Sequence, residues 1–84
     1  FAMSIHVRLS TTLRECVPGY VPEEGLDIDL APGEEAVTAG ELASRLGIPA
    51  AEIKIVMING RQGDLRNAVT EGDRIAYFPA VGGG

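Results

Sequence analysis

The segment 38–47 carries the helix signals of this 84-residue chain. Thr38 and Glu41 have the spacing of a capping box, in which two side chains accept hydrogen bonds from backbone N–H groups at the start of a helix. Leu42 and Leu46 lie one turn apart on one side, and Gly47 supplies the left-handed residue that often ends a helix. We therefore predict one main helix of about two turns over 38–46. A helix this short is marginal in water, so it must pack against a sheet.

Segments in which apolar and polar residues alternate lie on both sides of this helix. Such alternation predicts half-buried strands, because successive side chains of a strand point to opposite faces of a sheet. Asn59 and Gly60 are a two-residue hairpin signal, and a short strand is expected after them. The segment 10–25 has turn signals and no periodicity, so we predict a loop in which Leu13 and Val17 pack on the core. The predicted main strands are 5–9, 26–30, 54–58 and 74–78.

The predicted order is two strands, a helix, a strand, a short strand and a last strand. A mixed sheet of four to five strands with one helix across it buries these faces compactly, which makes the fold class α+β. If the first and last strands are parallel neighbours in the centre, the arrangement is the ubiquitin-like β-grasp. We predict one domain over 3–79 and a flexible tail over 80–84. Phe1 and Ala2 precede Met3 and are interpreted as an expression scar.

Charge and cysteine content argue against several classes of function. Twelve acids against seven bases give a net charge of −5, which argues against a nucleic-acid partner, because phosphates attract basic surfaces. No apolar run approaches the roughly 20 residues of a membrane-spanning helix, so we expect no membrane partner and a cytoplasmic location. Cys16 is the only cysteine and His6 the only histidine. The sequence therefore predicts neither an internal disulfide nor a metal site.

The sequence finishes with three glycines, Gly82, Gly83 and Gly84, which have no side chains to bury. Taken alone, such an end indicates fraying at a terminus. Glycine also lets a tail thread a narrow channel and adopt backbone angles that other residues resist. The residues that precede the glycines favour the second interpretation.

The segment 72–84, GDRIAYFPAVGGG, carries a resemblance to a known family. It is similar to the end of the MoaD/ThiS family of sulfur carriers, and most similar to the small subunit of molybdopterin synthase. Further matches are Leu13-Arg14-Glu15 after the first strand, the predicted helix, and Ile58-Asn59-Gly60. The resemblance covers the chain from Met3 onward.

This resemblance implies a ubiquitin-like carrier, not an enzyme with a side-chain active site. In the family, a ubiquitin-activating-like adenylyltransferase uses ATP and Mg²⁺ to adenylate the terminal carboxylate, and sulfur then replaces AMP to leave a thiocarboxylate. Carried over, Gly84 bears the reacting carboxyl group, Gly83 completes the diglycine, and Gly82 stands where the family usually has alanine. The large subunit of molybdopterin synthase takes up the tail, and sulfur passes to a pterin precursor. The resemblance implies no bound cofactor and no metal on the chain itself.

Three residues beside the glycines are candidates for binding a partner. Phe78 is the candidate aromatic anchor, with ordinary core packing as an equally weighted alternative. Pro79 stiffens the exit by fixing φ at about −65°, and Val81 is expected to fill a partner pocket. The family often has an aromatic stretch after the first strand where this chain has Leu9-Ser10-Thr11. We expect no partner contact there.

The remaining polar side chains are interpreted as structural or solvated. Cys16 has no activating base nearby in sequence, which a reactive thiolate needs. His6 is expected to face outward on the first strand, and the acidic pairs at 23–24 and 34–35 are expected to be solvated. Lys54, the only lysine, is interpreted as a strand-edge charge that also offers an isopeptide acceptor.

Three other functions stay open on the sequence. The first is a close variant of the carrier that delivers its sulfur to the thiazole of thiamine or to another metabolite. A ubiquitin-like modifier, joined through Gly84 to lysines of target proteins, begins from the same adenylate. A β-grasp binding module uses its sheet face and ignores its tail.

Overall fold

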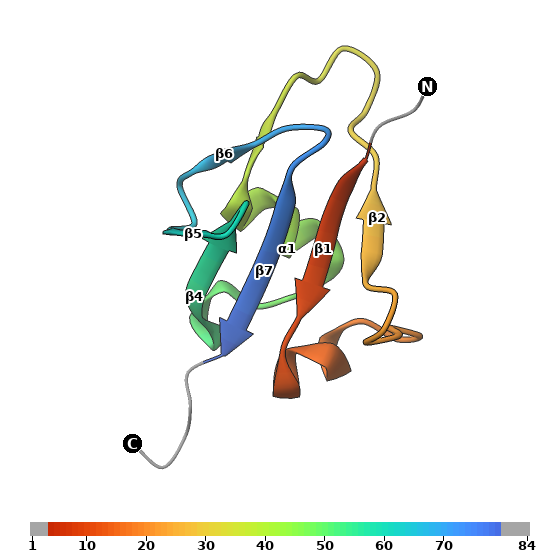
Figure 1. Cartoon of the computed structure of the whole chain (residues 1–84), viewed down its shortest axis with the longest axis vertical. Coiled ribbons are helices and arrows are strands. Elements are labelled where there is room, and N and C mark those ends of the chain that lie inside the picture. The colour runs from red at the N-terminus through yellow and green to blue at the C-terminus, as the bar shows by residue number, and fades with distance from the viewer. Residues whose placement is uncertain (1–3, 80–84) are drawn as a thin grey trace.

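The computed structural model describes residues 4–79. A five-stranded mixed sheet, in the order β2-β1-β7-β4-β5, forms the body, and one α-helix crosses it (Figure 1). A second sheet pairs two short strands, β3 and β6. The strands are β1 (Ile5–Leu9), β2 (Leu26–Ile28), β3 (Val37–Thr38), β4 (Ile53–Ile58), β5 (Arg61–Gly63), β6 (Ala68–Val69) and β7 (Arg74–Pro79). The helix α1 spans Ala39–Leu46, and the 3₁₀ helices η1 and η2 span Thr11–Cys16 and Ala50–Glu52.

The first and last strands are parallel neighbours, as Figure 1 shows for β1 and β7. Val7 lies opposite Ile75, and Leu9 lies opposite Tyr77. On its other side β7 pairs antiparallel with β4, so β7 is the central strand of the sheet. The outer strand β2 pairs antiparallel with β1. This topology confirms the predicted α+β class and the ubiquitin-like β-grasp arrangement.

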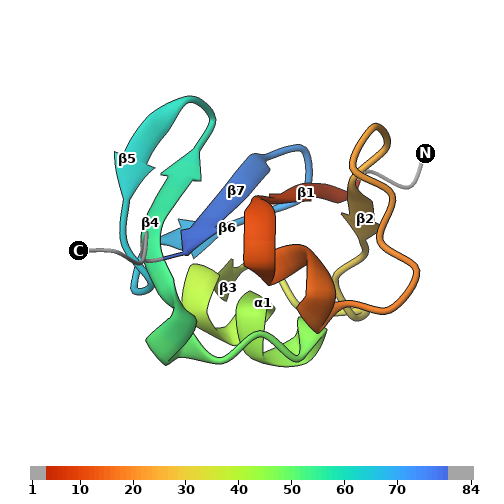
Figure 2. The same cartoon turned by 90° about the horizontal axis from the view of Figure 1, so that it is seen from below.

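The helix α1 begins and ends where its sequence signals predict. Thr38 is the N-cap residue, and its hydroxyl oxygen accepts a hydrogen bond from the backbone N–H of Glu41 at 3.1 Å. Gly47 adopts φ 85° at the C-terminal end, a conformation that favours glycine. Leu42 and Ala43 are buried against the sheet, and α1 lies along one face of it (Figure 2). We call this the inner face and the opposite one the outer face.

The core lies between α1 and the inner face. Tyr77 of β7 is fully buried, and its hydroxyl donates a hydrogen bond to the carbonyl of Ala39 at 2.7 Å. This bond connects the central strand to the first residue of α1. Burial also raises the pKa of the Tyr77 phenol, so the group stays protonated. The other buried apolar residues are Ile5, Val7, Leu9, Leu13, Leu30, Val37, Ala39, Leu42, Ala43, Ile48, Val56, Val69 and Ile75.

The segment 10–25 contains η1, which the sequence interpretation missed. Leu13 of η1 is buried and Val17 packs against the core, so the predicted inward positions of these two residues are confirmed. Further along, the Tyr20 hydroxyl oxygen accepts a hydrogen bond from the backbone N–H of Leu9 at 2.9 Å. Since β2 pairs with β1 only as far as Val7, Tyr20 supplies the partner that β2 does not reach. A 3₁₀ turn of this kind has no extended apolar period to reveal it.

Several other local predictions need correction. The second strand ends at Ile28, and Leu30 is buried beyond it. The chain after the Asn59-Gly60 hairpin contains β5 and β6, whereas we expected one short strand. Glu34 is not simply solvated, because both of its carboxylate oxygens accept hydrogen bonds from Arg45 of α1. These bonds lower the pKa of Glu34 to about 2.

Candidate functional site

The chain leaves the sheet at the end of its central strand. Pro79 is the last residue that the structure describes, and it lies opposite Ile53 at the start of β4. Because β1 and β7 are parallel, both strands finish at this end of the sheet (Figure 1). Val81, Gly82, Gly83 and Gly84 lie outside the described residues, so their predicted roles stay predictions. The structure does place Pro79, the described residue that comes before this segment in the sequence.

Phe78 points away from the helix. Along β7 the side chains of Ile75 and Tyr77 are buried on the inner face, so Arg74, Ala76 and Phe78 belong to the outer face. Phe78 is half-buried and lies outside the buried core cluster. Ordinary core packing, one of the two interpretations predicted for Phe78, therefore fits the structure less well than a role in binding a partner. Its role in binding a partner stays a prediction.

The outer face contains a hollow of about 410 Å³, which we call the outer hollow. Met57, Ala76 and Phe78 give it an apolar floor across β4 and β7. Met57 lies opposite Ala76 in the strand register, and Ile55 lies opposite Phe78. Ile55, which β7 pairs but β5 does not reach, is 38% exposed. The lining residues are His6, Arg8, Met57, Gly60, Arg74, Ile75, Ala76 and Phe78.

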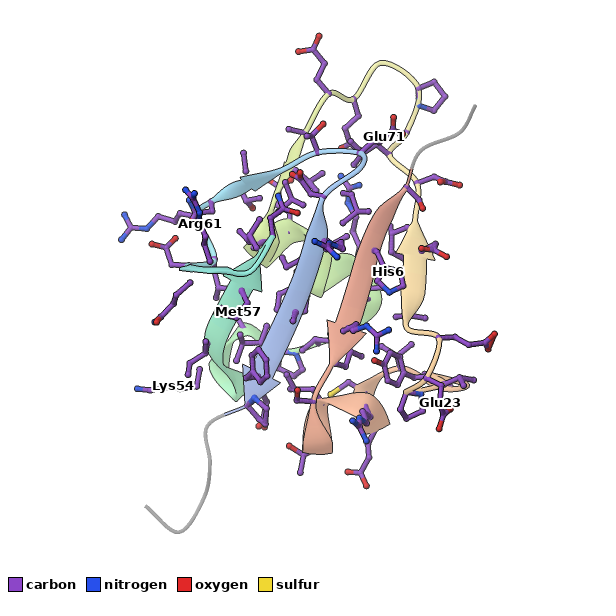
Figure 3. All side chains as sticks on the ribbon, in the orientation of Figure 1. His6, Glu23, Lys54, Met57, Arg61 and Glu71 are labelled. Carbon is purple, nitrogen blue, oxygen red and sulfur yellow. The ribbon has the colours of Figure 1, made fainter. Side chains whose placement is uncertain are left out.

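Basic side chains from β1 and β7 border this apolar floor. His6 lies opposite Arg74, and Arg8 lies opposite Ala76. Figure 3 shows His6 and Met57 on either side of β7. His6 Nδ1 is 2.9 Å from Asp27 Oδ1 on β2, which confirms that the imidazole faces outward. Arg8 donates one hydrogen bond to the carbonyl of Pro22 at 3.2 Å.

A comparison with protein families identifies the group to which this β-grasp belongs. The model of the family described as Mut7-C ubiquitin matches residues 2–82, almost the whole chain. The chain belongs to this family. The match includes Gly82 and stops before Gly83 and Gly84. It shows a small ubiquitin-like protein.

A search of solved structures supports the fold of this Mut7-C ubiquitin chain. The solution structure of the HVO 2177 protein of Haloferax volcanii superposes with a TM-score of 0.68 and 23% sequence identity. The alignment covers 99% of this chain and 88% of the other. At this identity the likeness shows the fold alone. No curated protein matches the chain.

Lys54 and Cys16 lie away from the outer hollow. Lys54 is exposed beside the irregularity between Ile53 and Ile55, and Figure 3 shows its side chain pointing away from the sheet. It also lines a second hollow of about 300 Å³ next to β5. The strand β4 is interior to the sheet, but β5 pairs with it only from Val56 onward, so Lys54 has no partner on that side among the described strands. Cys16 ends η1 as a half-buried free thiol that packs against the core.

Two features are absent from the part of the chain that the structure describes. Within residues 4–79, no helix is long and apolar enough to cross a membrane. In the same range, no group of three or more His, Cys, Asp or Glu side chains is placed to hold a metal ion.

The sequence interpretation missed the outer hollow itself. The apolar segment 54–58 is predicted as a strand, but an unbroken apolar run does not indicate which of its residues face outward. In the structure Val56 is buried while Ile55 and Met57 face outward. The alternation in 74–79 was a usable signal, because it places Arg74, Ala76 and Phe78 on one face. Recognising that β1 and β4 add to the same face required the strand order.

Proposed function

We propose that this chain is a sulfur carrier that works through the carboxyl group of Gly84. An adenylyltransferase partner activates that carboxylate with MgATP, forming the acyl-adenylate and releasing pyrophosphate. A sulfur nucleophile at the oxidation level of sulfide then attacks the acyl carbon, and AMP leaves. The product is a C-terminal thiocarboxylate, which donates its sulfur in molybdopterin synthesis.

The position of Pro79 carries this proposal. The central strand of the sheet ends there, and five residues that finish in Gly-Gly-Gly follow. A tail that starts at the end of a rigid sheet has a fixed origin, while its glycines can adopt backbone angles that a narrow active site requires. Membership of a ubiquitin-like family agrees with this arrangement.

The body of the domain has a separate part in the proposal. Ordering each tail residue in a partner's channel costs about 1–2 kcal/mol, so the domain has to contribute binding energy. Phe78 is suited to this role because it is half-buried on the outer face beside the exit. Pro79 limits the directions in which the tail departs. We assign these two residues to partner binding, together with Val81.

The choice of molybdopterin as the destination rests on the resemblance of 72–84 to the small subunit of molybdopterin synthase. The partners are then the adenylyltransferase and the large synthase subunit, and the chain is a co-substrate without an active site of its own. Thiamine thiazole is the alternative destination of the sulfur. Conjugation to lysines of other proteins is the alternative use of the same adenylate.

Intact mass spectrometry tests the proposal. The proposal requires Gly84 to be the last residue of the natural mature protein, so the mass of the protein from its own source is measured first. Incubation with the cognate adenylyltransferase, MgATP and sulfide is then expected to replace one oxygen by sulfur. Ladders of conjugates on other proteins would indicate the modifier instead.

Two variants sharpen this test. Deleting Gly83 and Gly84 together is expected to abolish the mass change, because only one terminal glycine then remains and the diglycine end is lost. Gly82→Ala is the matched control, and we expect it to keep the chemistry because alanine is the usual residue there in the resembled family. Equal loading of the deletion variant would contradict the proposal, and so would a large loss of rate in Gly82→Ala.

A further inference from the structure

The outer hollow carries positive charge on an acidic protein. The whole chain has a net charge of −5, yet none of the eight described residues that line the hollow is acidic. Two of them, Arg8 and Arg74, are cationic, whereas His6 is paired with the carboxylate of Asp27. Charge of this kind, gathered on one face against the overall sign, selects an anionic partner at that face.

The two arginines keep hydrogen-bonding capacity for such a partner. A guanidinium has five N–H donors. Arg8 uses one N–H group in its hydrogen bond to the Pro22 carbonyl. Within residues 4–79, the Arg74 side chain makes no hydrogen bond or ion pair. His6 is engaged by Asp27. Arg8 and Arg74 are therefore the groups able to bind a carboxylate, for which the planar guanidinium is well suited.

The apolar floor of the outer hollow favours a ligand that carries an apolar group next to its carboxylate. Met57 on β4 lies opposite Ala76 of β7, and Phe78 follows Ala76 on the same face of β7. Methionine adapts its shape to what packs on it. Arg8 on β1 and Met57 on β4 both lie opposite Ala76, on its two sides, and Arg74 starts β7. The hollow is therefore basic on its β1 side and at the Arg74 end, and apolar toward β4 and Phe78.

We infer that the outer hollow binds a short acidic segment of a partner protein, with its carboxylates on Arg8 and Arg74 and an apolar side chain over Met57 and Phe78. A free phosphate would leave the apolar floor uncovered. A nucleic acid or an anionic membrane would be repelled by the remaining surface of a chain with this net charge. The inference stands on the sheet face and is independent of the chemistry of Gly84.

Peptide selection followed by NMR titration tests the inference. Random peptides of a dozen residues, displayed on phage, are selected on the immobilised full chain. We expect the enriched peptides to combine Asp or Glu with Leu, Ile or Phe. Titrated into the ¹⁵N-labelled chain, they should shift the amides of Arg8, Met57, Arg74, Ala76 and Phe78. Enriched peptides without acidic residues, chemical-shift changes centred elsewhere, or no enrichment above background would overturn the inference.

Charge-reversal variants make the test specific. Arg74→Glu is expected to weaken the selected peptide at least about tenfold, the effect of losing a hydrogen bond between charged groups. Arg66→Glu is the matched control, because Arg66 is also exposed, lies outside the outer hollow and changes the net charge equally. Equal weakening by both variants would reduce the effect to long-range charge and would contradict the inference. If Arg74→Glu disturbs the ¹H–¹⁵N spectrum of the fold, Arg74→Gln takes its place.

Two further titrations exclude other anions, and a third separates this inference from the proposed function. Inorganic pyrophosphate and vesicles of anionic phospholipid are expected to leave the outer hollow unshifted, and stronger shifts there than with the peptide would refute the assignment. A chain that lacks residues 82–84 is expected to bind the peptide as the full chain does. Sulfur loading fails in that variant whether or not the peptide binds, so the two ideas are tested apart.

Discussion

Truncating Phe78 to alanine distinguishes an anchor from a core residue. Full burial of such a side chain stabilises a protein by roughly 1.5–3 kcal/mol, and Phe78 is only half-buried. Its cross-strand contact with Ile55 contributes a further 0.2–1 kcal/mol or so. We therefore expect Phe78→Ala to lower the free energy of unfolding by about 1–2 kcal/mol. A phenylalanine in a well-packed core would cost about 3–5 kcal/mol.

Urea unfolding and a loading assay together check this expectation. The comparison is Ile75→Ala, because Ile75 lies on the opposite face of the same strand and is 2% exposed. We expect this substitution to lower the free energy of unfolding by about 2–5 kcal/mol. Phe78→Ala should stay folded and yet be loaded by the adenylyltransferase at least about tenfold more slowly, as expected for a lost interface anchor. A stability loss of about 3 kcal/mol or more would place Phe78 in the core. Unchanged loading by a folded variant would remove its anchor role.

Three further substitutions test the framework around the sheet. Tyr77→Phe deletes the hydroxyl bonded to Ala39 and should cost about 1 kcal/mol in urea unfolding; no loss would mean that the bond is unimportant. Gly47→Ala places a Cβ at φ 85° and should cost roughly 1 kcal/mol; unchanged stability would contradict the assigned helix end. Because Arg45 lowers the pKa of Glu34 from 4.5 to about 2, the pair stabilises the fold above pH 4.5 and less as the pH falls toward 2. The thermal advantage of the native chain over Glu34→Gln should shrink across that interval, and an advantage independent of pH would refute the assigned ion pair.

Much of the fold follows from local signals in the sequence. The helix 38–46 has a cap, an apolar stripe and a stop within a single segment, and these features need no distant partner to take effect. The alternation of 5–9 and of 74–78 fixes which residues face the helix, whatever the strand order. The Asn59-Gly60 turn is equally local, and its positive φ angles of 52° and 81° are those that a two-residue hairpin requires.

The features that escaped prediction depend on contacts between distant segments. The strands β3 and β6 contain two residues each and pair with each other across about thirty positions of sequence. Strands of that length have no period to detect. The pairing of Glu34 with Arg45 likewise requires the loop before α1 to lie beside its last turn. The outer hollow is a third example, because its walls come from three strands whose order is set by the fold.

The central strand accounts for how one small domain can both fold and bind. Tyr77 and Ile75 of β7 are buried against α1, while Arg74, Ala76 and Phe78 alternate with them on the outer face. Stability and recognition are thus carried by neighbouring residues that point in opposite directions. Changes on the outer face can then alter a partner without exposing the core, because the inner face supplies the burial on which folding depends. Since this same strand leads to Pro79 and the residues after it, a partner held on the outer face would lie beside the start of the tail.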